Sequence, residues 1–390
     1  MKLIVLFFLL SSLASVAQSV SGRVVDDSTD KPLSQASVFV SNTSIGTTTA
    51  ADGSFTLNGV PAGSTELVVS YIGYETAVAQ LSGKGPKTFL FRLHIRNSDL
   101  ENVIVRSYEK NGWDHWGFLF RNNFIGTAAE AADCTIENTK DIGFIFSEQS
   151  QDLNAYAKKP IVIINKKLGY RIEFSLEQFT YNMKSRMLYF AGYPLFTPLK
   201  GGASRKKKWA AERRRVYNAS FLLFTRAVYN NRLAEEGFVV RKLVRLPNAE
   251  KERIRKKLRS ITDRSSLPAD TQAYYFKVMA QSDFSDILYS QPLAYSSFAT
   301  RTDSSTVVLQ FDDYLHITHT ATRLTAAERS LSGDSTPGSL LTSRITLQND
   351  RRIAINSSGG FFPPSNIILM DYWGWSEKAG RMLPLDYVPE

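Results

Sequence analysis

Between Val20 and Val105, short strand-like segments alternate with turn signals at intervals of about eight to twelve residues. Apolar and small polar side chains alternate over Ala36–Val40, which is the pattern of a strand with one buried face. Asp52-Gly53 predicts a hairpin turn, because glycine tolerates a positive φ and aspartate can bond its own backbone. We therefore predict that residues 20–105 form a β-sandwich of about seven strands.

Five motifs in this region follow one another in a fixed order. They read G-R-V-V-D, P-L-x-x-A-x-V, G-T-T-T-x-x-D-G-x-F-x-L, V-P-A-G and S-Y-I-G-Y-E, at residues 22–26, 32–38, 46–57, 60–63 and 70–75. The series resembles the carboxypeptidase-regulatory-like, or transthyretin-like, domain. The same module is similar to the N-terminal extension of TonB-dependent outer-membrane receptors of Bacteroidetes, where it ends in a strand like Leu100–Val105.

The resemblance implies a noncatalytic module suited to packing, partner contact or glycan binding. In metallocarboxypeptidases, such a sandwich accompanies a zinc peptidase domain whose metal site begins with an H-x-x-E pair. No histidine of this chain begins such a pair: they are His94, His115, His316 and His319. In the receptors, the module precedes a barrel of about 22 strands, for which too few residues follow Val105. Neither the peptidase nor the barrel is expected.

The first residues have the pattern of a cleavable signal peptide. Lys2 precedes an apolar run, Leu3–Leu10, and Ser15-Val16-Ala17 places small residues before Gln18. The apolar run is shorter than the roughly twenty residues that span a bilayer, and no cysteine follows the cleavage site for acylation. Residues 1–17 are thus predicted to direct export to the periplasm or outer-membrane surface of a Gram-negative bacterium.

Length and charge constrain the exported part. We expect a sandwich at residues 18–105, a linker at 106–111 and a larger domain at 112–390. The formal net charge of the chain is +10, and an exported basic protein meets anionic lipid surfaces, acidic glycans and acidic proteins rather than nucleic acid. Cys134 is the only cysteine, so packed cores rather than disulfides must stabilise the fold. No cofactor is expected.

The larger domain is predicted to be α+β with a mainly antiparallel sheet. Trp113, Trp116, Phe120 and Phe124 recur at helical spacing, either as core residues or as a carbohydrate-stacking platform. Thr127–Glu130 has the pattern of a capping box for a short helix that carries Cys134 near its end. A helix capped by Asn248 is expected at residues 249–260. Strands are expected at residues 161–164, 170–176, 187–190, 307–311, 315–319, 343–347 and 352–355.

The longest helical pattern runs from Ser204 to Glu236 and ends at Gly237. It carries the candidate anion-binding residues Arg205, Lys206, Lys207, Lys208, Arg213, Arg214 and Arg215. Cations at the start of a helix oppose its dipole, so local helix stability does not explain them. They form either a solvated surface or a face for an anionic ligand. Residues 217–241 are similar to uncharacterised exported Bacteroidetes proteins.

Catalytic patterns are sparse. Asp114-His115, between Trp113 and Trp116, is the acid/base candidate. His316 and His319, and likewise Asp312 and Asp313, have odd spacing, which on a strand directs side chains to opposite faces, so no metal site or carboxylate pair is expected. Gly83–Thr88 lacks phosphate-loop spacing and is predicted to be a turn.

Two functions remain open from the sequence. The first is a noncatalytic cell-envelope binding or assembly protein, with an envelope protein or a glycan as partner and a peripheral anionic membrane surface as a further candidate. The alternative is an unrecognised hydrolase that acts on glycan or peptide, motivated by the size of the second domain and by Asp114-His115. The sequence leaves the oligomeric state open.

Overall fold

The computed structural model describes residues 18–61, 65–81, 87–96, 108–261 and 267–390. The predicted signal peptide, the strand at Leu100–Val105 and most of the turn at Gly83–Thr88 lie outside these residues. The chain divides into two compact units. Unit 1 comprises residues 1–217, 356–360 and 378–390, and unit 2 comprises residues 218–355 and 361–377. The predicted linker at 106–111 remains a prediction.

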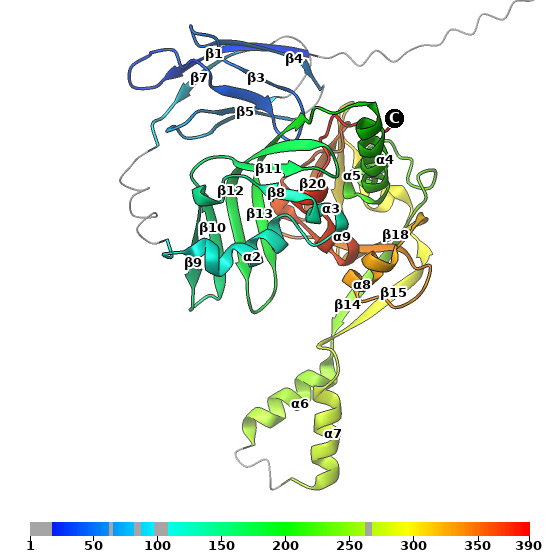
Figure 1. Ribbon diagram of the computed structural model, residues 1–390. Coiled ribbons are helices and arrows are strands. Elements are labelled where there is room, and N and C mark those ends of the chain that lie inside the picture. Colours follow the sequence, from blue (N-terminus) through cyan, green and yellow to red (C-terminus); the bar gives the residue numbers. More distant parts are fainter. Residues whose placement is uncertain (1–17, 62–64, 82–86, 97–107, 262–266) are drawn as a thin grey trace, which may run out of the picture. The chain divides into compact units, whose positions relative to one another are not determined.

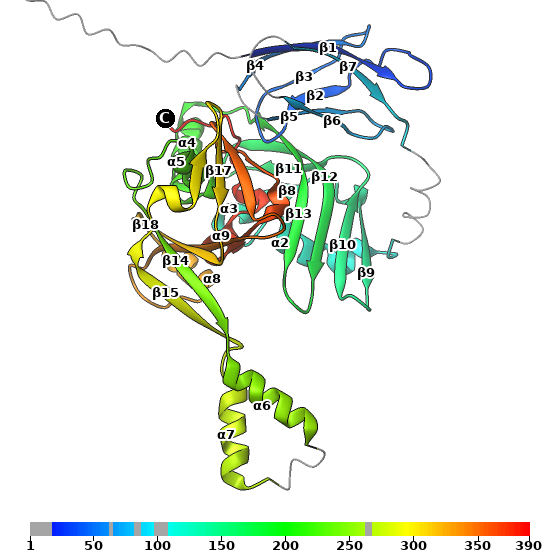
Figure 2. The same ribbon diagram turned by 180° about the vertical axis from the view of Figure 1, so that it is seen from behind.

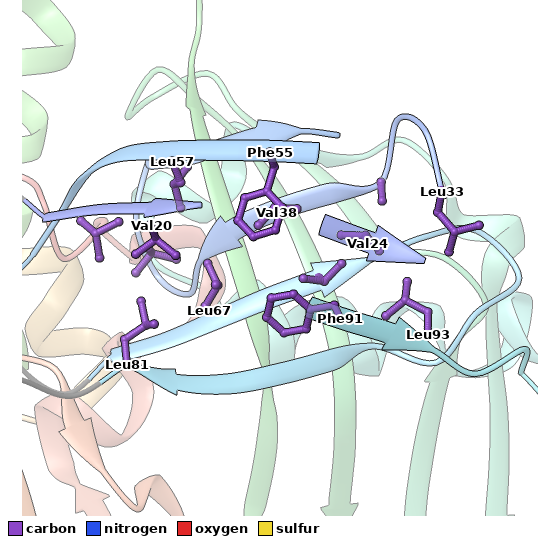
Figure 3. Packing of buried hydrophobic residues seen from close by; sticks show 14 residues of the cluster. Val20, Val24, Leu33, Val38, Phe55, Leu57, Leu67, Leu81, Phe91 and Leu93 are labelled. Carbon is purple, nitrogen blue, oxygen red and sulfur yellow. The ribbon is translucent and has the colours of Figure 1, made fainter. Parts of the chain in front are cut away.

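The N-terminal part of unit 1 is a β-sandwich, as the sequence predicts (Figure 1). One sheet has the order β4-β1-β7 and the other β3-β2-β5-β6, and the β1–β7 pair is parallel. Val20, Phe55, Leu67 and Phe91 belong to the core between the sheets (Figure 3). The strands are β1 (Gln18–Asp26), β2 (Ser37–Val40), β3 (Gly46–Thr48), β4 (Ser54–Val60), β5 (Thr65–Ser70), β6 (Ala77–Leu81) and β7 (Lys87–Leu93).

The turn at Asp52-Gly53 is present, but it does not close a hairpin. It joins β3 of one sheet to β4 of the other, because β3 pairs with β2 and β4 pairs with β1. Gly53 has φ +78°, and a Cβ there would lie 2.5 Å from the carbonyl oxygen of Val24. The local turn chemistry was correctly predicted; the sheet to which each strand belongs depends on longer-range pairing.

The rest of unit 1 contains an antiparallel sheet of order β8-β11-β12-β10-β9, with β13 paired to β12. Helix α2 (Gly112–Phe124) buries Phe120 and Phe124 among aromatic residues of this sheet, and Gly126 follows with φ +100°. The tryptophan-bearing helix is therefore confirmed. The other elements are α3 (Ala129–Ala132), β8 (Cys134–Ile136), β9 (Ile142–Ser147), β10 (Asp152–Ala157), β11 (Ile161–Asn165), β12 (Tyr170–Asn182), β13 (Leu188–Pro198) and the 3-10 turns η1 (Thr139–Asp141) and η5 (Ala379–Arg381).

Two helix predictions are wrong. Ala128, not Thr127, is the N-cap of α3, no side chain caps it, and Cys134 begins β8 instead of ending the helix. The predicted helix 204–236 is two helices, α4 (Ala203–Ala219) and α5 (Phe221–Tyr229). Ser220 accepts a hydrogen bond from the N–H of Leu223 (3.1 Å) and so acts as the N-cap of α5.

Unit 2 contains two antiparallel sheets, of order β15-β14-β18-β19-β22 and β16-β17-β20-β21. The strands are β14 (Phe238–Pro247), β15 (Phe284–Pro292), β16 (Ala299–Arg301), β17 (Thr306–Gln310), β18 (Tyr314–Arg323), β19 (Leu340–Leu347), β20 (Arg352–Asn356), β21 (Phe361–Phe362) and β22 (Ile367–Met370). The helices beyond α5 are α6 (Ala249–Ser260), α7 (Ala269–Met279), α8 (Ala326–Ser332), α9 (Asp371–Ser376), η3 (Tyr295–Ser297) and η4 (Pro364–Asn366). The predicted α+β class and antiparallel pairing are confirmed.

Strands β14 and β15 form a ribbon that extends beyond the other strands of their sheet, with α6 and α7 at its far end (Figures 1 and 2). Asn248 caps α6 as predicted, by accepting a hydrogen bond from the N–H of Lys251 (3.0 Å). We call residues 248–283 the helical hairpin. Its own small core includes Ile254, Tyr275 and Val278, which explains how two helices hold together outside the sheets.

Candidate functional site

Helix α4 is attached to the turn between β11 and β12 by two side chains of the basic run. The indole of Trp209 donates to the carbonyl of Lys166 (2.9 Å). The Arg213 guanidinium donates to the carbonyls of Leu168 (2.7 Å) and Gly169 (3.0 Å) and lies 3.9 Å from the centre of the Tyr170 ring. Arg213 therefore anchors the helix.

Arg215 also binds within the protein. It forms an ion pair with Glu130, whose side chain is only 1% exposed, and a second with Glu212 (3.1 Å). Arg381 lies 3.8 Å from the same buried Glu130 carboxylate. A buried carboxylate requires such cationic partners because desolvation of an unpaired charge is costly. Arg215 thus compensates a buried charge.

The other five candidate anion-binding residues are exposed. Within the described residues, no ion pair or hydrogen bond involves the side chains of Arg205, Lys206, Lys207, Lys208 or Arg214. We call these five residues the free cations of α4. The structure thus divides the predicted basic surface into two anchoring arginines and five solvated cations, a division that charge and spacing alone do not reveal.

The predicted acid/base pair is on α2, with both side chains exposed. The carboxylate that lies near His115 belongs to Glu109, whose Oε2 is 3.4 Å from Nδ1 of His115. The same oxygen accepts a hydrogen bond from the Trp116 indole (2.7 Å). Asp114 is not the carboxylate that contacts His115. Trp116 packs against Phe146 at a centroid distance of 5.2 Å, so this side of α2 is held by aromatic packing and one shared carboxylate.

His316 and His319 have different surroundings on β18. Nε2 of His319 donates to the carbonyl of Glu236 (2.8 Å), and the ring stacks on Phe238. Burial lowers the pKa of both histidines.

Asp312 pairs with Arg351 (2.7 Å) and Asp313 with Lys242 (3.2 Å), so the two adjacent carboxylates have separate partners.

Cys134 is buried, and burial raises the pKa of its thiol to about 12. Within the described ranges, no cluster of three or more histidine, cysteine, aspartate or glutamate side chains is arranged to hold a metal ion. In the same ranges, no helix has both the length and the apolar character needed to cross a membrane.

Sequence reasoning predicted helix α6 of the helical hairpin but missed α7 and the exposed aromatic side chains that it carries. Phe276 on α7 is 80% exposed, and neighbouring Tyr274 is exposed as well, although its hydroxyl donates to Glu250. The pattern of α7 contains a signal for this: Tyr275 and Val278, three residues apart, face the hairpin core, which leaves Phe276 outside. Phe276 and Tyr274 together leave apolar ring surface of α7 in contact with solvent.

The hairpin is also basic. Helix α6 has six lysines or arginines and two glutamates, a net charge of +4. Arg253 and then Tyr274 lower the pKa of Glu250 to about 2, and Arg255 pairs with Asp283 (2.6 Å). In the described part of the chain, the side chains of Lys256 and Arg259 make no ion pair and are exposed. The hairpin therefore combines an exposed aromatic ring with uncompensated positive charge.

The ribbon below the hairpin also exposes apolar side chains. Every residue of β15 is exposed, and so is Leu246 of β14. The exposed large apolar residues of β15 are Phe284, Ile287, Leu288 and Tyr289. With Tyr274 and Phe276 of the hairpin included, seven of the exposed large apolar side chains among the described residues lie from Leu246 to Tyr289.

The family model described as CarboxypepD_reg-like domain matches residues 20–105. This confirms the resemblance for the N-terminal sandwich, which is less than a quarter of the chain. No curated protein matches the chain.

Several solved structures align with parts of the chain. A chain of a mutant type II cohesin–X-dockerin complex from Acetivibrio cellulolyticus is 26% identical to this chain, with a TM-score of 0.17. The alignment covers 19% of this chain and 52% of that chain, so this chain spans about half the length of the protein that it matches. A candidate carbohydrate-binding protein from Bacteroides uniformis is 9% identical over 46% of this chain and 79% of its own, with a TM-score of 0.17. A candidate membrane-associated protein of unknown function from Bacteroides fragilis is 9% identical over 91% of this chain and 95% of its own, also with a TM-score of 0.17. Similarity of this degree does not establish a shared fold or activity.

Proposed function

We propose that this chain, whose residues 20–105 are a CarboxypepD_reg-like domain, is a noncatalytic binding or assembly protein of the bacterial cell envelope. In this proposal, the helical hairpin is the surface that takes the partner, and the partner is an acidic envelope protein or an acidic glycan. The observation that carries the proposal is the exposure of Phe276 on a basic element that protrudes from its sheet.

The construction of the hairpin supports a binding role. Its core is separate and small, so the exposed ring of Phe276 adds nothing to the packing of either sheet. Leaving a large apolar side chain in water forgoes roughly 1.5–3 kcal/mol of burial free energy. A partner that covers the ring recovers this free energy, and an acidic partner also pairs with Lys256 and Arg259.

The free cations of α4 support an anionic partner independently. Five exposed cations without internal ion pairs retain all their charge for an outside ligand. Isolated exposed pairs contribute only about 0–1 kcal/mol each, so several must converge on one ligand for useful affinity. In this proposal, the α4 surface binds phosphate or carboxylate groups of the envelope, and the hairpin supplies the apolar contact.

The ribbon geometry provides a clean test of the hairpin. The N–H of Asn248 donates to the carbonyl of Asp283 (2.8 Å), so the strands are adjacent where the hairpin begins. Residues 249–282 can therefore be replaced by Asn-Gly, which suits a two-residue hairpin turn. The two proteins are compared by affinity capture from cross-linked envelopes.

We expect the full chain to capture a defined envelope protein or glycan and the shortened chain to lose it, while far-UV circular dichroism confirms that the sheets remain. Capture of bulk lipid alone by the full chain contradicts the proposal. Equal capture by both chains contradicts the assignment of the hairpin as the contact surface.

A further inference from the structure

The outer edge of β15 carries backbone groups that no strand of the described residues pairs with. β15 is the edge strand of its sheet and has β14 on one side only. The hydrogen bond from Asn248 to Asp283 makes that pair a hydrogen-bonded one, and pairs alternate along the antiparallel register. Asp286 and Leu288 consequently fall in non-hydrogen-bonded pairs, so their N–H and C=O groups point away from β14.

Between Phe284 and Tyr289, this edge lacks two of the features by which proteins usually protect an exposed strand, namely proline and lysine; the register shift and Pro292 come later in β15. From Phe284 to Gln291 it contains no proline and no lysine, and its side chains are exposed throughout. Its one charged residue, Asp286, is neutralised by Arg245 at 2.7 and 2.8 Å and by Arg344 at 2.9 Å. The edge is thus an uncharged, partly apolar template for another strand.

We propose that β15 pairs antiparallel with β15 of a second copy of this chain, about a two-fold axis at Ile287. In this register, Ile287 lies opposite Ile287 of the second copy, and Asp286 of each copy lies opposite Leu288 of the other. The outward N–H of each of these two residues then donates a hydrogen bond to the C=O of the residue opposite it. A register centred on Asp286 would place two carboxylates opposite each other, which is unfavourable.

A second copy is the occupant that matches this edge because the edge is complementary to itself. The outward groups recur two residues apart and are related by the axis, as an isologous contact requires. The register between β14 and β15 shifts after Leu288, which limits regular pairing to a few residues. A short symmetric contact fits that limit, and we expect a weak dimer whose fraction rises with concentration.

The register predicts a specific cross-link. Across the new interface, the two Ile287 residues form a non-hydrogen-bonded pair, in which Cα atoms lie about 4.5 Å apart, within the range that a disulfide bridges. Mild oxidation of purified Ile287→Cys should therefore give a covalent dimer. Ser285→Cys is the matched control, since Ser285 lies opposite Tyr289 in this register. Cys134 is the only natural cysteine and is buried, so the background is low.

Sedimentation velocity tests the contact without cross-linking. Ile287→Asp places two carboxylates opposite each other and should weaken association at least about tenfold, whereas Ser285→Asp should not. Ile287 is 47% exposed, so neither variant should alter the monomer fold.

Three results would overturn the inference: a wild-type chain that stays monomeric at high concentration, a dimer indifferent to Ile287→Asp, or equal cross-linking by Ser285→Cys. The shortened chain without residues 249–282 keeps β15 and should still dimerise, so failure here is distinguishable from failure of the hairpin proposal.

Discussion

Arg213 and Arg214 are adjacent, have the same side chain and differ in what they contact. Arg213 makes two charge-assisted hydrogen bonds to carbonyls and a cation–π contact with Tyr170, whereas Arg214 is an exposed free cation of α4. Arg213→Gln and Arg214→Gln remove the same charge from the same helix. Comparing the two substitutions therefore isolates the anchoring contacts from the general effect of charge.

The expected magnitude follows from these contacts. A hydrogen bond to a charged group contributes about 1.5–3 kcal/mol when buried, and a partly exposed cation–π contact about 0.5–1 kcal/mol. Because Arg213 is half-buried, we take the lower part of each range and allow glutamine to keep one weak bond. Arg213→Gln should lower the free energy of unfolding by about 2–3 kcal/mol, and Arg214→Gln by less than about 0.5 kcal/mol.

Urea unfolding followed by tryptophan fluorescence measures this difference, because Trp209 lies on the same helix and bonds to the same turn. The transition midpoint should fall in Arg213→Gln with an unchanged denaturant dependence. Equal stability of the two variants, or a larger loss in Arg214→Gln, would refute the division into anchoring and free cations.

Three further predictions concern the free cations of α4, the buried imidazole of His319 and the buried thiol of Cys134. Lys206→Gln/Lys207→Gln should weaken retention on vesicles that contain lipid A in a salt-dependent manner while the midpoint of thermal unfolding is unchanged; unaltered retention would count against the anion surface. Burial holds the pKa of His319 below its ordinary value, so the unfolded chain takes up the proton first as the pH falls below about 6.5, and stability should fall there. His319→Gln should reduce this loss, by at most about 1.4 kcal/mol per pH unit, in urea unfolding at pH 7.5 and 5.5. The Cys134 thiol should react with an alkylating reagent at pH 8 at least about 100-fold more slowly in the folded chain than in urea, and equal rates would show that it is accessible.

The sequence predicted the sandwich because its signals are local. Turn residues such as Asp52 and Gly53 favour a turn through their own side chain and backbone, whatever the rest of the fold. Strands in which apolar and polar side chains alternate likewise show locally that one face is buried. The sheet to which β3 and β4 belong was missed because it is decided by pairing with β2 and β1, which no local pattern reports.

The helix break at Ser220 was missed for a related reason. The apolar stripe of Tyr217, Phe221, Phe224 and Val228 continues through the break, and these residues are all buried, so periodicity favours one helix. A serine within such a stripe is ambiguous, since it becomes an N-cap only when the backbone turns there.

The candidate surfaces were predicted only in part. Charge located the basic run but could not distinguish Arg213 from Arg214, because the distinction depends on where the turn 165–169 lies against α4. The exposed ring of Phe276 was missed because an apolar residue in a helical pattern is usually assigned to a core. Exposure depends on the helical hairpin lying beyond its sheet, which is a property of the fold.

Site-specific photo-cross-linking at the hairpin tests the proposed binding role most directly. Phe276 and Phe118 are matched, since both are on helices and are 80% and 79% exposed. A photoreactive phenylalanine analogue is placed at one position or the other in the full chain, and cells are irradiated before the envelope is solubilised. We predict a discrete adduct from position 276 and none from position 118. The same adduct from both positions, or an adduct from position 118 alone, would contradict the assignment of the helical hairpin as the partner surface.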